Sequence, residues 1–208
     1  SKDKFTNSYV SCVANAITQE TGTSYQWEVN VFNDKAINAF ALPGGKIGVY
    51  TGILEVASSQ DQLAAVIGHE VAHVLASHGN ERVSVAFAAD SGLKIAQVLA
   101  GKPTQQKAQL LGLLGLGAQV GVLLPYGRTQ ESEADILGLE YMANAGFDPR
   151  QSVVLWQNMG KAGGQKPPEL LSTHPSNATR INGLNSHMEA AMKLYQQARA
   201  NNKKPNCR

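Results

Sequence analysis

The sequence predicts a mainly helical α+β fold in which a short sheet of three strands lies over one central helix. Long stretches of the chain repeat apolar side chains at helical intervals. Segments 26–32, 39–41 and 46–50 are instead short and bounded by turn residues, which is typical of strands. The 208 residues are 43% hydrophobic, enough to form the core of one domain, with or without arms.

The elements before the central helix follow from apolar spacing and turn residues. Residues 3–21 are expected to form an amphipathic helix, which Gly22 ends. In 26–32, apolar residues alternate with polar ones, as they do in a half-buried strand. The Pro-Gly-Gly sequence at 43–45 indicates that the next two strands form a hairpin.

The central helix is expected over 59–78, where Ser58 and Ser59 can cap its start and Gly79 can stop it. The later segments with a helical pattern are 80–101, the stretch around Glu131, 149–161 and 177–200. Segment 110–124 is strongly apolar, but its length of about 15 residues is short of the roughly 20 that cross a bilayer. This segment can be interpreted as a packed core helix or as a segment that touches a membrane or forms a lid.

The central helix carries His69-Glu70-Val71-Ala72-His73. Because residues four apart share a helix face, His69 and His73 can bind one metal ion. Glu70 is rotated about 100° from His69, so it lies beside the metal, where a general base for a water molecule is needed. Two imidazoles leave Zn²⁺ short of the three protein ligands that a catalytic zinc site uses.

The third ligand is expected from a second helix, where Glu131 and Asp135 share one face. Glu131 fits as the carboxylate ligand, and Asp135 can accept a hydrogen bond from the outer nitrogen of a ligating histidine. Glu133 lies off that face and is expected to be solvated. His78 is five residues past His73, on nearly the opposite helix face, so we expect it at the surface or helix end and not on the metal.

The charge and cysteine content of the chain limit its possible partners and its cellular compartment. A formal charge of +2, with no basic block longer than Lys203-Lys204, argues against nucleic acid as a partner. Cys12 and Cys207 lie near opposite ends of the chain, without metal-type spacing. A disulfide between them would imply an oxidising compartment, and two free thiols are the alternative. No signal peptide begins at Ser1, which indicates a processed or trimmed chain.

Several segments together resemble one protease family. His-Glu-x-x-His followed by Glu131-x-x-Ala-Asp resembles the zinc metalloproteases that include HtpX, the CAAX prenyl endopeptidases, the mitochondrial Oma-type proteases and the periplasmic BepA and LoiP. Residues 38–52 look like the family's strand-turn-strand, and 172–176 with Arg180-Ile181 look like its late His-Pro segment. The resemblance runs from about Val29 to Ile181. Transmembrane helices, present in some members, are not evident, which favours the soluble branch.

The resemblance implies a zincin-like metallopeptidase with one Zn²⁺ per chain. We expect a single domain over 1–208, with a helical arm at 1–25, a catalytic core at 26–181 and a C-terminal helix and tail at 182–208. The expected substrates are extended, unfolded or misassembled proteins, cleaved for quality control in the bacterial periplasm or at the envelope membrane. Contact with a membrane surface or with outer-membrane assembly is a further expectation.

Further residues are expected to bind the substrate or to act on it. An edge strand over the metal helix would pair with the substrate, which makes Asn38, Ala39 and Phe40 the binding residues. Besides zinc, the oxyanion needs hydrogen-bond donors, and the candidates are His174, Tyr126 and Arg128. The following proline holds His174 extended, and the family resemblance places this segment near the zinc. This histidine is therefore expected to reach the cleft, either to ligate zinc or to aid catalysis.

Two other functions are compatible with these motifs. The first is a metal-dependent hydrolase of a non-peptide bond, because His-Glu-x-x-His does not by itself specify the bond that is cleaved. The second is a latent metalloprotease that acts mainly as a chaperone or scaffold. The natural substrate and the oligomeric state remain open at this stage.

Overall fold

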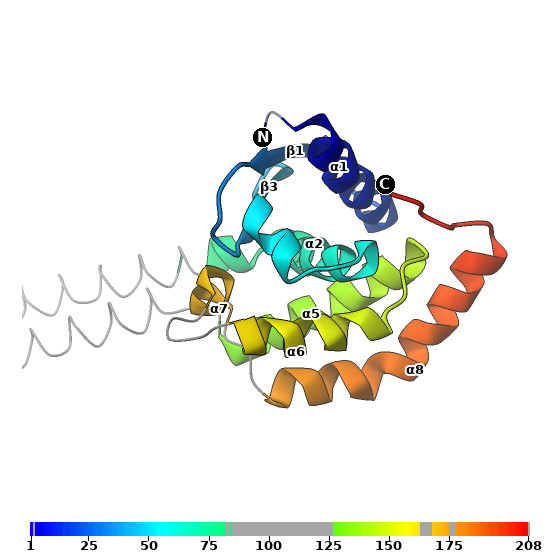
Figure 1. Cartoon of the computed structure of the whole chain (residues 1–208). Coiled ribbons are helices and arrows are strands. Elements are labelled where there is room, and N and C mark those ends of the chain that lie inside the picture. Colours follow the sequence, from blue (N-terminus) through cyan, green and yellow to red (C-terminus); the bar gives the residue numbers. More distant parts are fainter. Residues whose placement is uncertain (2, 82–83, 85–126, 163–167, 175–177, 208) are drawn as a thin grey trace, which may run out of the picture.

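The computed structural model describes residues 1, 3–81, 84, 127–162, 168–174 and 178–207 (Figure 1). The expected helix at 80–101, apart from its first residues, the apolar segment 110–124 and the candidate donor Tyr126 lie outside the described residues. None of the described helices combines the length and apolarity needed to cross a bilayer.

The described elements confirm a mainly helical α+β fold with a small sheet. The helices are α1 (Lys4–Thr18), α2 (Gln60–Leu75), α5 (Arg128–Asn144), α6 (Arg150–Ala162), α7 (Glu169–Thr173) and α8 (Ala178–Ala200). The strands are β1 (Glu28–Phe32), β2 (Ala39–Leu42) and β3 (Lys46–Tyr50). The expected helix over 3–21 consists of α1 and a short 3₁₀ helix at Gln19–Thr21. A 3₁₀ helix at Thr51–Glu55 and the helix α7 are additions to the expected elements.

The sheet has the order β1-β3-β2, so β2 is an edge strand. β2 and β3 form the expected antiparallel hairpin, whereas β1 runs parallel to β3. One face of the sheet is buried against the helices, and the rings of Phe32, Phe40 and Tyr50 contact one another on the other face. Gly48 lets the ring of Phe40 lie against that face, because a Cβ there would lie 2.3 Å from the ring and would displace it.

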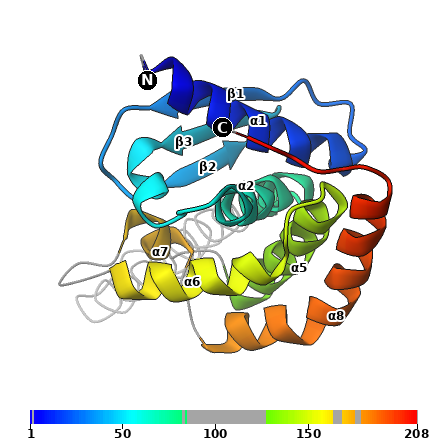
Figure 2. The same ribbon diagram turned by 45° about the vertical axis from the view of Figure 1, so that its right-hand side comes forward.

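The sheet, α2, α5 and α8 lie in successive layers (Figure 2). α2 is apolar on almost every side and buried from Gln62 to Val74, as expected for a helix at the centre of a domain. It touches α5 at Gly68 and Gly138, where a Cβ on Gly138 would lie 2.8 Å from the backbone nitrogen of His69. This close approach places the first half of α5 beside the two histidines of α2.

The C-terminal segment crosses back over the fold to α1, near the start of the chain (Figure 1). Cys12 of α1 and Cys207 form a disulfide, which confirms the favoured pairing. The side-chain carbonyl of Gln60 accepts a hydrogen bond from the backbone N–H of Cys207, at 2.9 Å, and its amide donates to the carbonyl of Pro205, at 3.0 Å. The tail therefore fastens the first turn of α2 to α1.

The end of α2 differs from the expectation. The helix stops at Leu75 and not near 78, and Gly79 does not end it. Ser77 adopts a left-handed conformation, with φ at 59°, which non-glycine residues rarely do. The backbone therefore turns before His78, and a helical extrapolation no longer gives the direction of that side chain.

Candidate metal centre

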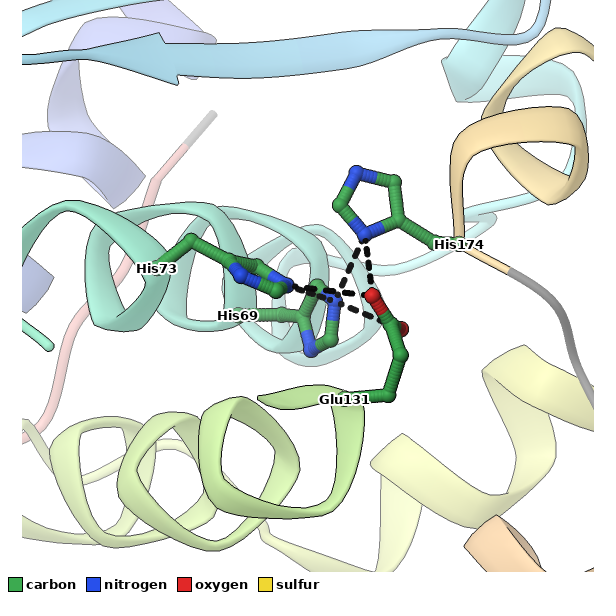
Figure 3. Close-up of side chains that lie close together, drawn as sticks. All are labelled: His69, His73, Glu131 and His174. Carbon is green, nitrogen blue, oxygen red and sulfur yellow. Dashed lines mark hydrogen bonds and ion pairs between the residues drawn. The ribbon is translucent and has the colours of Figure 1, made fainter. Parts of the chain in front are cut away.

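Four side chains from three helical regions converge in the interior (Figure 3). His69 and His73 come from α2, Glu131 from α5 and His174 from the residue after α7. One nitrogen or oxygen of each lies within 4.8 Å of the others, and all four side chains are buried. The Nε2 atoms of His69 and His73 are 3.1 Å apart, and Nδ1 of His174 is 3.3 Å from Nε2 of His69.

The spacing of these atoms fits a four-coordinate divalent metal ion. Glu131 Oε1 lies 2.9 Å from His174 Nδ1 and 3.4 Å from His73 Nε2, and its Oε2 lies 3.4 Å from His69 Nε2. A tetrahedron with zinc–nitrogen bonds of typical length has edges of about 3.3–3.4 Å. Imidazole nitrogens and a carboxylate are also ligand types that such an ion prefers.

Glu70 lies beside the cluster and not in it, as its helical position predicts. Its side chain is buried, and within the described residues its Oε1 atom has no hydrogen-bond partner. Nε2 of His174 lies 3.6 Å from this oxygen, which is too far for a hydrogen bond. A buried carboxylate oxygen without a hydrogen bond is costly in a folded protein, and a catalytic role is one reason for which such a group is kept.

Asp135 and Arg180 form the layer behind the cluster. Asp135 Oδ1 lies 3.1 Å from Nδ1 of His69, which is the contact expected from the sequence. Arg180 of α8 donates two hydrogen bonds of 2.6 Å to the two oxygens of Asp135, and its Nη1 lies 2.6 Å from Glu131 Oε2. Its guanidinium also stacks over the ring of Trp156, at 3.9 Å. Arg180 therefore forms ion pairs with both buried carboxylates.

Sequence reasoning did not assign this role to Arg180. Local spacing could not reveal it, because α8 begins more than forty residues after Asp135. The only signal was its place in the late segment that resembles the protease family. A buried arginine with two carboxylate partners is evident only once α8 is seen packed against α5.

Residues 4–188 match the model of peptidase family M48. The chain belongs to this family. It is 40% identical over 179 residues to mitochondrial metalloendopeptidase OMA1 of Schizosaccharomyces pombe, covering 85% of this chain and 51% of that protein. It is 34% identical over 175 residues to human mitochondrial metalloendopeptidase OMA1, covering 81% and 33%. It is 27% identical over 158 residues to the beta-barrel assembly-enhancing protease of Escherichia coli K12, covering 73% and 32%.

The M48 match confirms the resemblance seen in the sequence. It spans both helices that carry the cluster and the late segment that carries His174 and Arg180. The chain spans about half the length of the fission yeast relative, and about a third of the human and bacterial ones.

The remaining expected residues of this M48 chain lie at different distances from the cluster. Arg128 is exposed at the first residue of α5. Asn38 directly precedes β2, Ala39 is buried, and the ring of Phe40 covers Gly48 on the outer face of the sheet. These positions are compatible with backbone contacts to a substrate, and the roles of these residues stay predictions.

The expected surface position of His78 was wrong, although His78 is not part of the four-residue cluster. This histidine is buried, with 2% of its surface exposed, and its Nδ1 lies 2.9 Å from Nδ1 of His73. The left-handed Ser77 is the reason, since the backbone there leaves the helical path on which the expectation was based. Glu133 is solvated as expected, with 55% of its side chain exposed, yet its Oε2 lies 3.1 Å from Nε2 of His78.

A pocket of about 130 Å³ adjoins the cluster. It lies between β2 and the end of α2, and its lining includes Ala41, Leu42, His73 and Val74. The pocket therefore connects the edge strand with His73 of the cluster.

The charges of the cluster follow from its burial and contacts. Burial raises the pKa of Glu131, but hydrogen bonds with His174, His69 and His73 outweigh it and hold that pKa well below its usual range. Burial lowers the pKa of His73 to about 3. Burial and Arg180 also act to lower the pKa of His69, but hydrogen bonds to Asp135 and Glu131 outweigh them and raise it to about 9.

Metal binding to this site should therefore strengthen as the pH rises toward 9. The metal-free protein holds a proton on His69 below about pH 9, and a ligating imidazole must be neutral. Loss of one proton on binding makes the affinity rise about tenfold per pH unit. A competitive chelator titration at several pH values between 6.5 and 8.5 measures the slope. The variant His187→Ala, which removes an exposed histidine, is the control, and a flat profile in the native protein would contradict the assignment.

Proposed function

We propose that this chain is a zinc-dependent endopeptidase that cleaves extended segments of unfolded or misassembled proteins. The observation that carries the proposal is the buried set of ligand atoms from His69, His73, Glu131 and His174, with the carboxylate of Glu70 beside it. Relatives named as metalloendopeptidases support peptide bonds as the target.

His69, His73 and Glu131 would hold the zinc ion, which polarises the scissile carbonyl and lowers the pKa of a water molecule. Glu70 accepts the proton of that water molecule and delivers it to the leaving amine. Asp135 accepts a hydrogen bond from Nδ1–H of His69, which keeps the Nε2 lone pair directed into the cluster. Arg180 keeps the carboxylates of Glu131 and Asp135 charged and in place.

The free edge of β2 is the proposed substrate-binding strand. The backbone N–H of Tyr50 donates to the carbonyl of Asn38, at 3.1 Å. Hydrogen-bonded and non-bonded pairs alternate along an antiparallel ladder, so Asn38 and Phe40 bond to β3 while Ala39 and Ala41 turn their backbone groups outward. An extended peptide can pair with these groups as an added strand. The pocket lined by Leu42 and His73 lies where a substrate side chain would project.

Hydrolysis of an unstructured peptide tests the proposed activity. Cleavage should stop when the metal is chelated, return when zinc is restored, and not occur in the same sequence held in a folded domain. Single N-methylation of successive peptide amides should slow cleavage at every second position, because only alternate amides face β2. Chelator-insensitive cleavage, or hydrolysis of model esters without any peptide hydrolysis, would reject the proposal.

For the biological role we propose protein quality control in an oxidising envelope compartment such as the bacterial periplasm. The Cys12–Cys207 disulfide supports such a compartment. The name of the Escherichia coli relative supports a link to the assembly of β-barrel proteins, although other relatives are named as mitochondrial. Thiol labelling of the protein inside intact cells tests this, and two reduced cysteines there would exclude it.

The position of His174 favours a latent resting state. Its Nδ1 lies among the atoms that would surround the zinc ion, where a water molecule and the substrate carbonyl have to bind. We propose that His174 occupies the fourth zinc position at rest and swings aside to admit the substrate. In the open state its imidazole can donate a hydrogen bond to the oxyanion.

His174→Ala should therefore accelerate peptide cleavage while zinc remains bound. If the open form is a minor state of about 0.1–10%, removing the plug raises the rate at least about tenfold. Initial rates and zinc content of the same samples decide the matter, with His187→Ala as the exposed-histidine control. A lower rate with zinc retained would show that the histidine mainly aids catalysis, and no change in either quantity would exclude both roles.

A further inference from the structure

The two metal-facing histidines of α2 have different partners on their outer nitrogens. Nδ1 of His69 faces the buried carboxylate of Asp135, at 3.1 Å. Nδ1 of His73 instead faces Nδ1 of His78, at 2.9 Å. Nε2 of His78 in turn faces Oε2 of Glu133, at 3.1 Å. His73 is therefore linked to a carboxylate through a second imidazole.

The backbone builds this link at a strained position. Ser77 turns with a φ of 59°, and the imidazole of His78 is thereby packed at 71° to the ring of His73. His78 is among the largest fully buried side chains of the described residues. Strain and burial of a polar ring both cost free energy, so an imidazole held in this place needs a functional reason.

The hydrogen bonds of the link form one consistent chain. His73 can ligate zinc through Nε2 only if its proton is on Nδ1. That N–H then donates to Nδ1 of His78, which has to be the acceptor nitrogen of a neutral ring. The proton of His78 is consequently on Nε2, where it donates to the Glu133 carboxylate. Each contact thus fixes the tautomer of the next ring. Because the Glu133 carboxylate can only accept, it sets the direction in which all the hydrogen bonds of the link are donated.

We propose that His78 is a positioning residue, which together with Glu133 fixes His73 in the tautomer and orientation that bind zinc. The inference rests on the proposed zinc site. Hydrogen-bond partners behind a metal ligand typically change metal affinity 10–100-fold. His78 should contribute most of the effect, because it is buried, whereas the contact of the half-exposed Glu133 is screened by solvent.

A matched pair of substitutions separates this role from simple packing. His78→Asn keeps an acceptor oxygen near the position of Nδ1, whereas His78→Leu keeps the bulk and removes the acceptor. We expect His78→Leu to lower zinc affinity about 10–100-fold and His78→Asn to recover most of that loss. Glu133→Gln, at a solvated position that tolerates substitution, should lower the affinity by a smaller factor.

The readouts are zinc affinity by chelator competition and the visible absorption spectrum of the cobalt-substituted protein, which reports ligand geometry. Denaturant unfolding of the metal-free variants measures the packing effect separately. A native affinity and spectrum for His78→Leu and Glu133→Gln would overturn the proposal. The proposal would also be overturned if His78→Leu and His78→Asn lost the same amount of zinc affinity and this loss matched their loss of stability without metal. Because no readout depends on peptide cleavage, a native protein that binds zinc but cleaves no peptide would reject the proposed function and leave this inference intact.

Discussion

Replacement of Glu70 by glutamine is expected to slow peptide hydrolysis by about 10²–10⁴-fold, the usual contribution of a general acid–base group. The amide has nearly the same shape as the carboxylate but cannot accept the proton of the attacking water molecule. Zinc should stay bound, because Glu70 lies beside the ligand set and not in it. The fold should persist as well, since Oε1 of Glu70 forms no hydrogen bond within the described residues.

Turnover and bound zinc, measured on the same preparation, test this expectation. Glu140→Gln is a suitable control, because Glu140 is an exposed glutamate of α5. Substantial turnover by zinc-loaded Glu70→Gln would remove Glu70 from the role of base. Loss of zinc together with activity would instead indicate that Glu70 helps to hold the metal.

Arg180→Met should destabilise the metal-free protein by about 3–5 kcal/mol, the cost of removing one partner from a buried ion pair. The methionine retains much of the packing on Trp156, but it leaves the carboxylates of Glu131 and Asp135 buried without their cation. Only 3% of the Arg180 side chain is exposed, so solvent cannot replace the lost contacts. Zinc affinity should fall as well, because Asp135 no longer holds His69 in place.

Urea unfolding of the metal-free protein measures the first effect. Lys193→Met is the matched control, because it breaks an exposed ion pair with Glu189 on the same helix and should change stability very little. If Arg180→Met proves as stable as Lys193→Met, the guanidinium is not what keeps the two carboxylates in the interior.

The sequence by itself determined the parts of the site that lie within one helix. The spacing of His69 and His73, the offset of Glu70, and the shared face of Glu131 and Asp135 all follow from helical periodicity. The structure places these side chains accordingly. Most element positions were also predictable, because apolar spacing, caps and glycine turns act over a few residues. The hairpin of β2 and β3 is an example.

Tertiary structure decided which helices pack against each other and how closely they approach. The close approach of α2 and α5 depends on Gly68 and Gly138, which lie seventy residues apart and show no joint pattern in the sequence. Arg180 acquires its role only because α8 packs on α5. The parallel pairing of β1 with β3 is likewise a long-range contact.

The expectation for His78 shows why a local rule can fail. Extrapolating the helix past Leu75 placed this histidine on the opposite face from His73, whereas a single left-handed residue, Ser77, brings the two rings together. A helix continues only while its backbone torsion angles do, and no spacing rule reports where they change. Helical spacing in the sequence therefore predicted the cluster residues of α2 and α5, whereas the tertiary structure determined which residues pack behind them.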